Sequence, residues 1–372
     1  MLIGILGAGQ LGRMLALAGL PIGLRFRFLD PAEDAVAAHV GELIVGDFDD
    51  PAALARFARG LSVCTFEFEN VPAAALRAVA AHCPVWPPVE ALETGQDRLA
   101  EKTLFQRLGL SVHPFAPAST RDEFAAALRT VGLPAVAKTR RMGYDGKGQA
   151  VIRTPADADA AWEALGAVPL LVEALVPFDR ELSVIGVRAR SGEHRAYPLV
   201  ENVHDRGILR LSRAPADVTP ALQAAATAHS KAVMDALGYV GVLTIEFFDA
   251  AGTLLANEMA PRVHNSGHWT IEAARTSQFE NHLRALADLP LGDTTPRGPS
   301  AMVNLIGACP PLSDLLRVPG AHPHLYGKGP REGRKVGHVT ITGDSATLAR
   351  STQAVLALAT EHHTPLHPDA NP

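Results

Sequence analysis

The chain has 372 residues, of which 47% are hydrophobic, and it carries a formal net charge of −5. This length allows two or three domains with sizeable cores, and the composition excludes a disordered protein. Because the charge balance gives no basic footprint, nucleic acid is not expected as the main partner.

The cysteines and the apolar N-terminal segment bear on location. Cys64, Cys83 and Cys309 form an odd set without metal-binding or redox spacing, which is typical of a reducing compartment. Residues 1–24 are apolar, but they include no basic leader and contain Arg13 among several glycines. No other stretch is apolar for long enough to span a bilayer. We therefore expect a soluble, cytoplasmic protein.

Residues 1–95 are expected to form a Rossmann-like parallel sheet domain, because short apolar strands alternate with Ala-rich helices. Strands are predicted at 2–6, 24–29, 43–45 and 62–66. Gly7-x-Gly9-x-x-Gly12 follows the first strand, and Asp30 ends the second. In a dinucleotide-binding enzyme such glycines approach the pyrophosphate and the acid binds the ribose. The same glycines serve any tight strand-to-helix turn, so a nicotinamide-dependent dehydrogenase stays only an alternative.

The fourth predicted strand ends in an acidic motif, residues 65–71 (Thr-Phe-Glu-Phe-Glu-Asn-Val). Strand alternation places Glu67 and Glu69 on one face at the carboxyl end of a parallel strand, where open α/β sheets bind ligands. The alternative is a polar strand end that caps the next helix through Asn70. We expect at least one of the two acids to be functional.

Residues 96–294 are expected to form a two-lobed domain, with a small α+β lobe over about 115–175. A helix is predicted over 96–108, and Thr120 with Glu123 resembles a capping box that begins another.

Within the small lobe, Lys138 ends a strand that enters a loop at 139–148. Gly143, Gly146 and Gly148 free the backbone to fold over phosphates, and Lys138 supplies a fixed positive charge. No Gly-Lys-Ser/Thr triplet opens a following helix, so this is not the Walker pattern. An ordinary flexible hairpin is the poorer account of so many glycines and charges.

Glu246 and Glu258 lie on two predicted strands joined by the turn signal at 249–252. A two-residue turn would pair Glu246 with Asn257 and send Glu258 to the other face. A three-residue bulged turn would pair Glu246 with Ala256 and make Glu258 a same-face diagonal neighbour about 7 Å away. We predict the bulged turn, with the two acids sharing Mg²⁺. A solvated edge hairpin is the alternative, but the apolar surroundings oppose it.

The last part of the chain, residues 295–372, is expected to form a small β-rich domain after a linker at 292–299. Strands are predicted near 301–306 and 336–342, and the tail after Thr360 is expected to fray. Cations cluster near a turn at Lys328, Arg331, Arg334 and Lys335. Anion binding and a solvated basic turn account for this cluster about equally well.

Together these features indicate ATP-dependent ligation or phosphoryl transfer. The motifs at 7–14, 65–71, 143–149, 257–269 and 333–338 resemble the ATP-grasp superfamily and, within it, the 5-(carboxyamino)imidazole ribonucleotide synthase family of de novo purine biosynthesis. The string at 257–269 is the most specific of them. The resemblance implies an α/β and α+β protein of ATP-grasp architecture, with a Rossmann-like domain, a two-lobed ATP-grasp domain and a small C-terminal domain.

The resemblance also implies a reaction. ATP would phosphorylate bicarbonate to carboxyphosphate, and the exocyclic amine of 5-aminoimidazole ribonucleotide would take up the carboxyl group, directly or through CO2. The products would be the N-carboxylated ribonucleotide, ADP and phosphate. Mg²⁺, with Mn²⁺ as a substitute, would be held by Glu246 and Glu258. A homodimer is implied as well, with no nucleic-acid or membrane partner.

Motif positions give the residues that the resemblance implies for each substrate. Residues for ATP are Arg98, Lys138, Gly143, Tyr144, Asp145, Gly146, Lys147, Gly148, Gln149, Glu173, Ala174, Leu175, Val176, Glu181, His204, Asn257 and Glu258. Residues for the ribonucleotide and bicarbonate are Gly9, Gln10, Leu11, Glu67, Tyr144, Lys147, Arg262, His264, Asn265, Ser266, Lys328, Arg334 and Lys335. Asp145 would accept the amine proton, and Arg262 and Lys328 are the other implied catalytic residues.

Two departures from the family pattern and three alternatives remain. Met142 stands where many relatives have glycine, which would stiffen the loop without removing a ligand, and the tail after Thr360 does not match. The alternatives are a sister ATP-grasp ligase (a formate-dependent glycinamide ribonucleotide transformylase or a biotin-dependent carboxylase subunit), a dehydrogenase, and an idle nucleotide-binding scaffold. The string at 257–269 opposes the first, and the intact Lys138, Asp145, Glu246 and Glu258 oppose the last.

Overall fold

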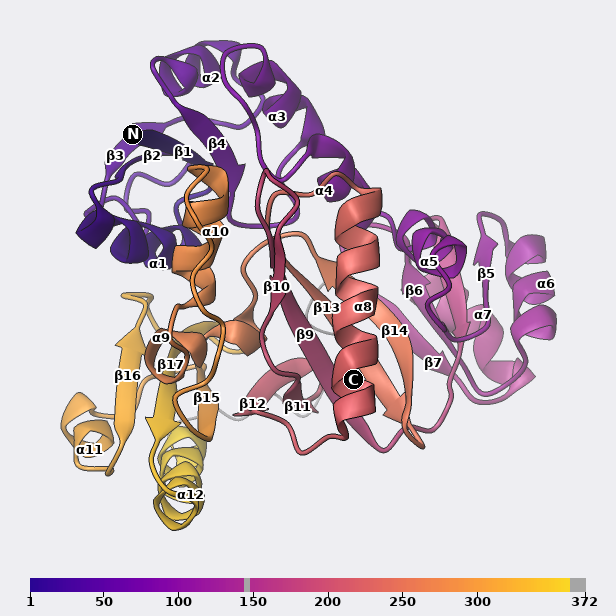
Figure 1. Ribbon diagram of the computed structural model, residues 1–372. Helices are drawn as coiled ribbons and strands as arrows, with labels where there is room; N and C mark the ends of the chain where they lie inside the picture. The colour runs from indigo at the N-terminus through magenta and orange to yellow at the C-terminus, as the bar shows by residue number, and fades with distance from the viewer. Residues whose placement is uncertain (144–147, 362–372) are drawn as a thin grey trace.

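The computed structural model describes residues 1–143 and 148–361 (Figure 1). Its N-terminal part is the predicted parallel sheet, in the order β3-β2-β1-β4. The elements are β1 (Leu2–Leu6), α1 (Gln10–Gly19), η1 (Leu20–Ile22), β2 (Arg25–Asp30), β3 (Glu42–Val45), α2 (Pro51–Ala58), β4 (Val63–Phe66), α3 (Ala73–Ala80) and α4 (Val89–Gly95). Because β1 and β4 pair in parallel, the glycine loop after β1 meets the acidic motif after β4.

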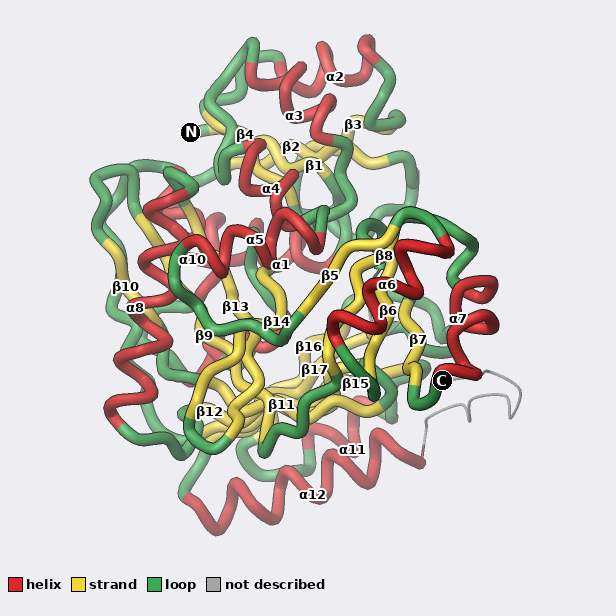
Figure 2. The backbone as a smooth tube through the Cα atoms, turned by 90° about the vertical axis from the view of Figure 1, so that its right-hand side faces the viewer, coloured by secondary structure: helices red, strands yellow, loops and turns green. Residues whose placement is uncertain are grey.

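A small lobe projects from one side of the molecule (Figures 1 and 2). Its four-stranded antiparallel sheet has the order β5-β8-β6-β7. The elements are β5 (Phe115–Ala118), α6 (Arg121–Val131), β6 (Ala135–Thr139), β7 (Gln149–Ile152), η2 (Pro155–Asp157), α7 (Ala158–Ala164) and β8 (Leu170–Ala174). The Thr120 hydroxyl accepts a hydrogen bond from the Glu123 amide at 3.2 Å, so the predicted helix cap is confirmed.

The third sheet is the largest and joins the centre of the chain to its end. Its main path is β14-β13-β9-β11-β12-β15-β17-β16, with β10 paired to β9. The strands are β9 (Arg180–Arg188), β10 (His194–Ala196), β11 (Val200–Asp205), β12 (Ile208–Ala214), β13 (Gly241–Ala250), β14 (Thr253–Ala260), β15 (Ser300–Ile306), β16 (Ala321–Leu325) and β17 (Lys335–Thr342). Because β12 pairs with β15, the strands after residue 299 extend the central sheet.

Helices cover this sheet and connect it to the other two. They are α5 (Arg98–Arg107), α8 (Pro220–Ala236), η3 (Asn265–Gly267), α9 (Thr270–Ala273), α10 (Gln278–Leu286), α11 (Leu312–Leu316) and α12 (Ser345–Glu361). The predicted helix at 96–108 begins later, because Asp97 is its N-cap and accepts from the Leu99 amide. Helix α12 is not predicted from the sequence. Residues 362–372, most of the tail that is expected to fray, lie outside the described residues.

The prediction of a three-residue bulged turn between β13 and β14 is wrong. The turn has two residues, Ala251 and Gly252, both with positive φ, which is the favoured hairpin geometry. The bulge lies instead within β14, where Asn257 is the extra residue. The extra residue shifts the register by one, so Glu258 takes the place opposite Glu246. The two acids are therefore direct cross-strand partners rather than diagonal neighbours.

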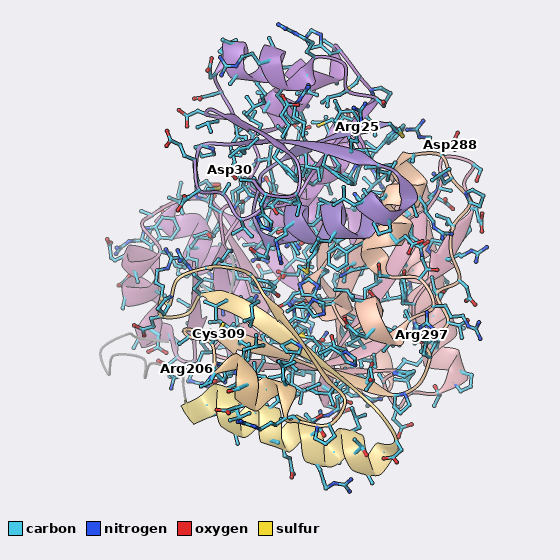
Figure 3. The ribbon with its side chains drawn as sticks, turned by 90° about the vertical axis from the view of Figure 1, so that its left-hand side faces the viewer. Arg25, Asp30, Arg206, Asp288, Arg297 and Cys309 are labelled. Carbon is cyan, nitrogen blue, oxygen red and sulfur yellow. The ribbon has the colours of Figure 1, made fainter. Side chains whose placement is uncertain are left out.

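A buried histidine fixes the N-terminal domain to the central sheet. The His282 Nδ1 atom accepts from the Val242 amide at 3.0 Å, and its Nε2 atom lies 3.2 Å from the Thr65 hydroxyl. Burial lowers the pKa of His282 to about 3, so the ring is neutral and Nε2 donates. Figure 3 views the molecule from the left-hand side of Figure 1, with Asp30 on the N-terminal domain and Cys309 on the C-terminal part. No helix of the described chain has the apolar length needed to cross a membrane.

Candidate active site

Glu246, near the middle of β13, pairs with Glu258, two residues before the end of β14. Glu258 belongs to residues 257–269, which we call the polar string. The Arg98 guanidinium donates to Glu258 at 2.9 Å, and His264 Nε2 lies 3.4 Å from Glu246. Burial, followed by the charge of Glu258, raises the pKa of Glu246 to about 7. Burial also acts to raise the pKa of Glu258, but the charge and hydrogen bond of Arg98 outweigh it and lower the pKa. Two carboxylates held this close together therefore favour the binding of a cation.

The donor set of this pair fits a hard divalent cation. Two carboxylates face each other across the hairpin. The Oδ1 atom of Asn257, the residue before Glu258, is buried without a hydrogen-bond partner. Oxygen ligands of this kind suit Mg²⁺. Within the described ranges, no group of three or more His, Cys, Asp or Glu side chains could hold a metal ion. A cation here would need further oxygen ligands, which the phosphates of a nucleotide supply.

A buried ion-pair network faces the hairpin from the small lobe. Glu173 on β8 is 2.6 Å from the Lys138 ammonium and 3.0 Å from that of Lys102. Burial alone would raise the pKa of Glu173, but the two lysines hold it far below its usual range. The predicted ATP residue Lys138 is thus fixed by a carboxylate, whereas Lys102 was not predicted.

Helix α5 and its N-cap contribute two more residues that were not predicted. Asp97 binds Arg140 at 2.6 Å and Arg141 at 3.2 Å, where the loop leaves β6. Glu101 accepts from the Met259 amide at 2.6 Å and is buried. The available signal was a pair of charged residues, 101 and 102, one turn before Leu104 and Phe105 on the buried helix face.

The remaining predicted ATP residues lie along β8, β9 and β11. His204 on β11 is 2.7 Å from Glu181 on the adjacent strand β9. Burial lowers the pKa of His204, but the Glu181 hydrogen bond and the charge of Glu246 outweigh it, so the pKa is raised. The Ala174 carbonyl accepts from His113, and the Leu175 amide donates to Pro134 at 3.0 Å. The Ala174 carbonyl and the Leu175 amide therefore already form hydrogen bonds within the protein. Val176, the last of the predicted adenine-binding residues, comes next in the chain.

The N-terminal glycine loop holds a carboxylate. The amides of Gly9 and Gly12 donate to Glu67, the latter at 2.6 Å, and the Ala8 amide donates to Asp30 at 2.9 Å. Lys328 reaches the loop from the C-terminal part and donates to Gln10, which precedes Leu11. A pyrophosphate would have to displace both acids to bind these amides, which removes the basis of the dehydrogenase alternative.

Beyond β14, the polar string contacts both the N-terminal domain and the interior of the central sheet. Arg262 donates to Glu69 at 2.8 Å, which links the string to the acidic motif after β4. His264 Nδ1 lies 2.9 Å from the fully buried Ser266 hydroxyl, which accepts from Ser183 at 2.8 Å. Asn265 pairs with Asn304 on β15. The hydroxyl of Ser266 and the amide of Asn265 are thus tied to the scaffold.

The glycine loop of the small lobe is only partly described. Tyr144, Asp145, Gly146 and Lys147 lie outside the described residues, and Gly143, Gly148 and Gln149 flank them. Met142 is exposed and has a φ of 64°, the left-handed region where glycine is favoured. In the C-terminal part, Arg334 donates to the Gly329 carbonyl at 3.2 Å, and Lys335 begins β17.

Three family models match successive parts of the chain. They describe a ribonucleotide synthetase preATP-grasp domain (residues 1–96), an ATP-grasp domain (103–279) and a phosphoribosylaminoimidazole carboxylase C-terminal domain (300–352). With the sheets and the paired acids described above, they define the chain as an enzyme of the ATP-grasp class, a ligase.

Relatives along the whole chain narrow the class. The N5-carboxyaminoimidazole ribonucleotide synthase of Pseudomonas aeruginosa is 52% identical over 96% of this chain and 99% of its own, and that of Bacillus subtilis is 39% identical over 91% and 90%. A synthetase structure of that name from Thermus thermophilus superposes with a TM-score of 0.93 at 56% identity, covering 98% of this chain and 100% of its own. The chain belongs to the N5-carboxyaminoimidazole ribonucleotide synthase family.

A further solved relative carries ligands. The synthase from Aspergillus clavatus, in complex with ADP and 5-aminoimidazole ribonucleotide, superposes with a TM-score of 0.90 at 31% identity, over 97% of this chain and 98% of its own.

Proposed function

We propose that this protein carboxylates the exocyclic amine of 5-aminoimidazole ribonucleotide with ATP and bicarbonate, giving the N5-carboxyamino ribonucleotide, ADP and phosphate in purine biosynthesis. The observation that carries the proposal is the pairing of Glu246 with Glu258 opposite the Lys138–Glu173 network. Two acids for a metal and two fixed cations, Arg98 and Lys138, converge on one place from the four elements β13, β14, α5 and β6. Phosphoryl transfer needs such a set of opposite charges.

The chain's own residues account for the two halves of the reaction. Arg98 and Lys138 bind the ATP phosphates, and their charge favours the leaving group as the γ-phosphoryl moves to bicarbonate. Mg²⁺, or Mn²⁺ in its place, held by Glu246 and Glu258, supplies charge neutralisation at the phosphates when bound. Arg262 and Lys328, with Glu67, His264, Arg334 and Lys335, hold bicarbonate and the ribonucleotide. Asn265 and Ser266, whose side chains are tied to the scaffold, hold this segment in place. Asp145, outside the described residues, takes the amine proton.

The order of the residues along the chain supports this assignment. Asn257 and Glu258, on the nucleotide side, are followed within a few residues by Arg262, whose partner Glu69 lies two residues after Glu67. Carboxyphosphate decomposes in water, so the two halves must be adjacent and the site must exclude water. The loop at residues 139–148 is the predicted lid that excludes water from the site. We further propose that the protein is cytoplasmic and that it forms a homodimer. Sedimentation of the purified protein tests the dimer.

The test is an ADP-release assay with ATP and Mg²⁺, to which bicarbonate and 5-aminoimidazole ribonucleotide are added separately and then together. The expected result is release that rises strongly only when the ribonucleotide is present. Release without any response to the ribonucleotide would contradict the proposal. Stimulation by formate and glycinamide ribonucleotide instead would indicate the sister transformylase.

A further inference from the structure

The bulge in β14 decides whether the two metal-site acids face each other. Without the extra residue Asn257, Glu258 would turn to the opposite face from Glu246, because side chains alternate along a strand. A bulge leaves part of the ladder unpaired, and β14 is an edge strand with no strand on its free side, where the Ala256 amide donates to the Ser111 carbonyl at 2.7 Å. Something other than the ladder must therefore fix its position.

Helix α5 packs against that free side of β14 (Figure 2). The Lys102 ammonium donates to the Ala256 carbonyl at 3.1 Å, immediately before the bulge. The Glu101 carboxylate accepts from the Met259 amide at 2.6 Å, immediately after Glu258. Two successive helix residues thus bind the strand on both sides of the Asn257–Glu258 step.

The two side chains are costly to bury, which argues against a purely packing role. Glu101 and Lys102 are each only 2% exposed. Apolar residues of similar volume often stabilise a protein as well as buried polar or ionic groups or better, so we attribute the burial of Glu101 and Lys102 to the geometry that they specify. The Lys102 ammonium also binds Glu173 on β8. Because β8 pairs with β6, which carries Lys138, Lys102 links β14 to the strands of the ATP-binding lysine.

We propose that Glu101 and Lys102 are positioning residues that clamp the β14 bulge and so hold Glu258 opposite Glu246 for a divalent cation. Neither residue touches the reacting atoms. The inference rests on the proposed function for the identity of the cation and the nucleotide. Its consequence is that either residue can be changed to weaken metal binding while the ribonucleotide side stays intact.

The experiment measures Mn²⁺ binding by electron paramagnetic resonance, without turnover, for the metal alone and with ADP. Lys102→Met and Glu101→Leu are compared with Glu101→Gln, which keeps an oxygen for the Met259 amide, and with Lys231→Met, an exposed change on α8. We expect Mn²⁺ to bind about tenfold more weakly to the first two variants, the size of one lost charged hydrogen bond, and normally to the two controls. In turnover, KM for ATP should rise and KM for the ribonucleotide should not.

A folded Lys102→Met protein that binds Mn²⁺ as Lys231→Met does would overturn the proposal, whatever its thermal stability. If Lys102→Met fails to fold, the Glu101 pair decides, and equal Mn²⁺ binding by the Leu and Gln variants would overturn it. Wild-type protein without ribonucleotide-stimulated ADP release would instead contradict the proposed function, and the Mn²⁺ comparison would still test the clamp.

Discussion

The N-terminal and central domains hold buried carboxylates in different ways. At the glycine loop, Glu67 is bound mainly by backbone amides, those of Gly9 and Gly12. At the central site, Glu258 and Glu173 are bound by the side-chain cations Arg98, Lys138 and Lys102. Amides impose position without adding net charge, whereas cations also bring charge that a nucleotide phosphate can share. A glycine-rich turn alone therefore does not identify the nucleotide site.

The largest expected effect breaks the central site. We expect Glu258→Gln to abolish turnover, a loss of at least about a thousandfold in kcat, because the variant removes one of two metal ligands and the partner of Arg98. The fold should persist, since the hairpin register does not depend on the charge. Initial rates and circular dichroism measure both. Glu280→Gln, in an i,i+4 pair on α10, is the matched control. Wild-type activity in Glu258→Gln would remove the metal-site hypothesis.

The second effect falls on the glycine loop. A Cβ atom on residue 9 would lie 2.6 Å from Glu67 Oε1, so Gly9→Ala must displace that carboxylate. We expect KM for the ribonucleotide to rise about tenfold while KM for ATP stays unchanged, the size of one weakened charged hydrogen bond. Gly298→Ala, where an added Cβ meets no atom, is the control. A selective rise in KM for ATP would reverse the assignment of the two sites.

A third, smaller effect concerns Asp97, which joins α5 to Arg140 and Arg141. Asn keeps the cap but loses the charge, so Asp97→Asn should lower the free energy of unfolding by about 1–2 kcal/mol near pH 7. Burial acts to raise the pKa of Asp97, but the Arg140 hydrogen bond and charge outweigh it, and the pKa is lowered.

The sign of the pH dependence follows from that lowered pKa. The contribution is fully present above the unfolded carboxyl pKa of about 3.9 and is lost as the pH falls through the lower folded value. Urea unfolding from about pH 7 downward should therefore show wild type and Asp97→Asn converging at acidic pH. Exposed Asp34→Asn should track wild type throughout. A difference that stays constant at every pH would show that the ion pair contributes nothing.

The smallest effect lies outside both sites. Arg121 on α6 pairs with Asp159 and Glu163 on α7, and all three side chains are at least half exposed. Arg121→Ala should change the free energy of unfolding by less than about 1 kcal/mol and should leave both KM values unchanged. A larger loss in thermal or urea unfolding would mean that the small lobe depends on surface charge.

The sequence predicted the fold class because its motifs extend over most of the chain and its strand–helix alternation is regular. It also brought Glu246 and Glu258 to one hairpin. The turn was mispredicted because a two-residue turn with a bulge at Asn257 and a three-residue turn satisfy the same turn signal. Lys102 was missed because a charged residue in a helix is ordinarily solvated, and its partners, Glu173 and Ala256, are distant in sequence.

The central claim is that one site couples ATP cleavage to activation of bicarbonate and carboxylation of the amine. Its most direct test is turnover of the wild-type enzyme with ¹⁸O-labelled bicarbonate, followed by mass analysis of the inorganic phosphate. Attack of a bicarbonate oxygen on the γ-phosphorus followed by C–O cleavage leaves that oxygen in the phosphate. The account predicts one labelled oxygen in each phosphate formed in step with the carboxylated ribonucleotide. Phosphate without label, whose fourth oxygen comes from solvent, would contradict it.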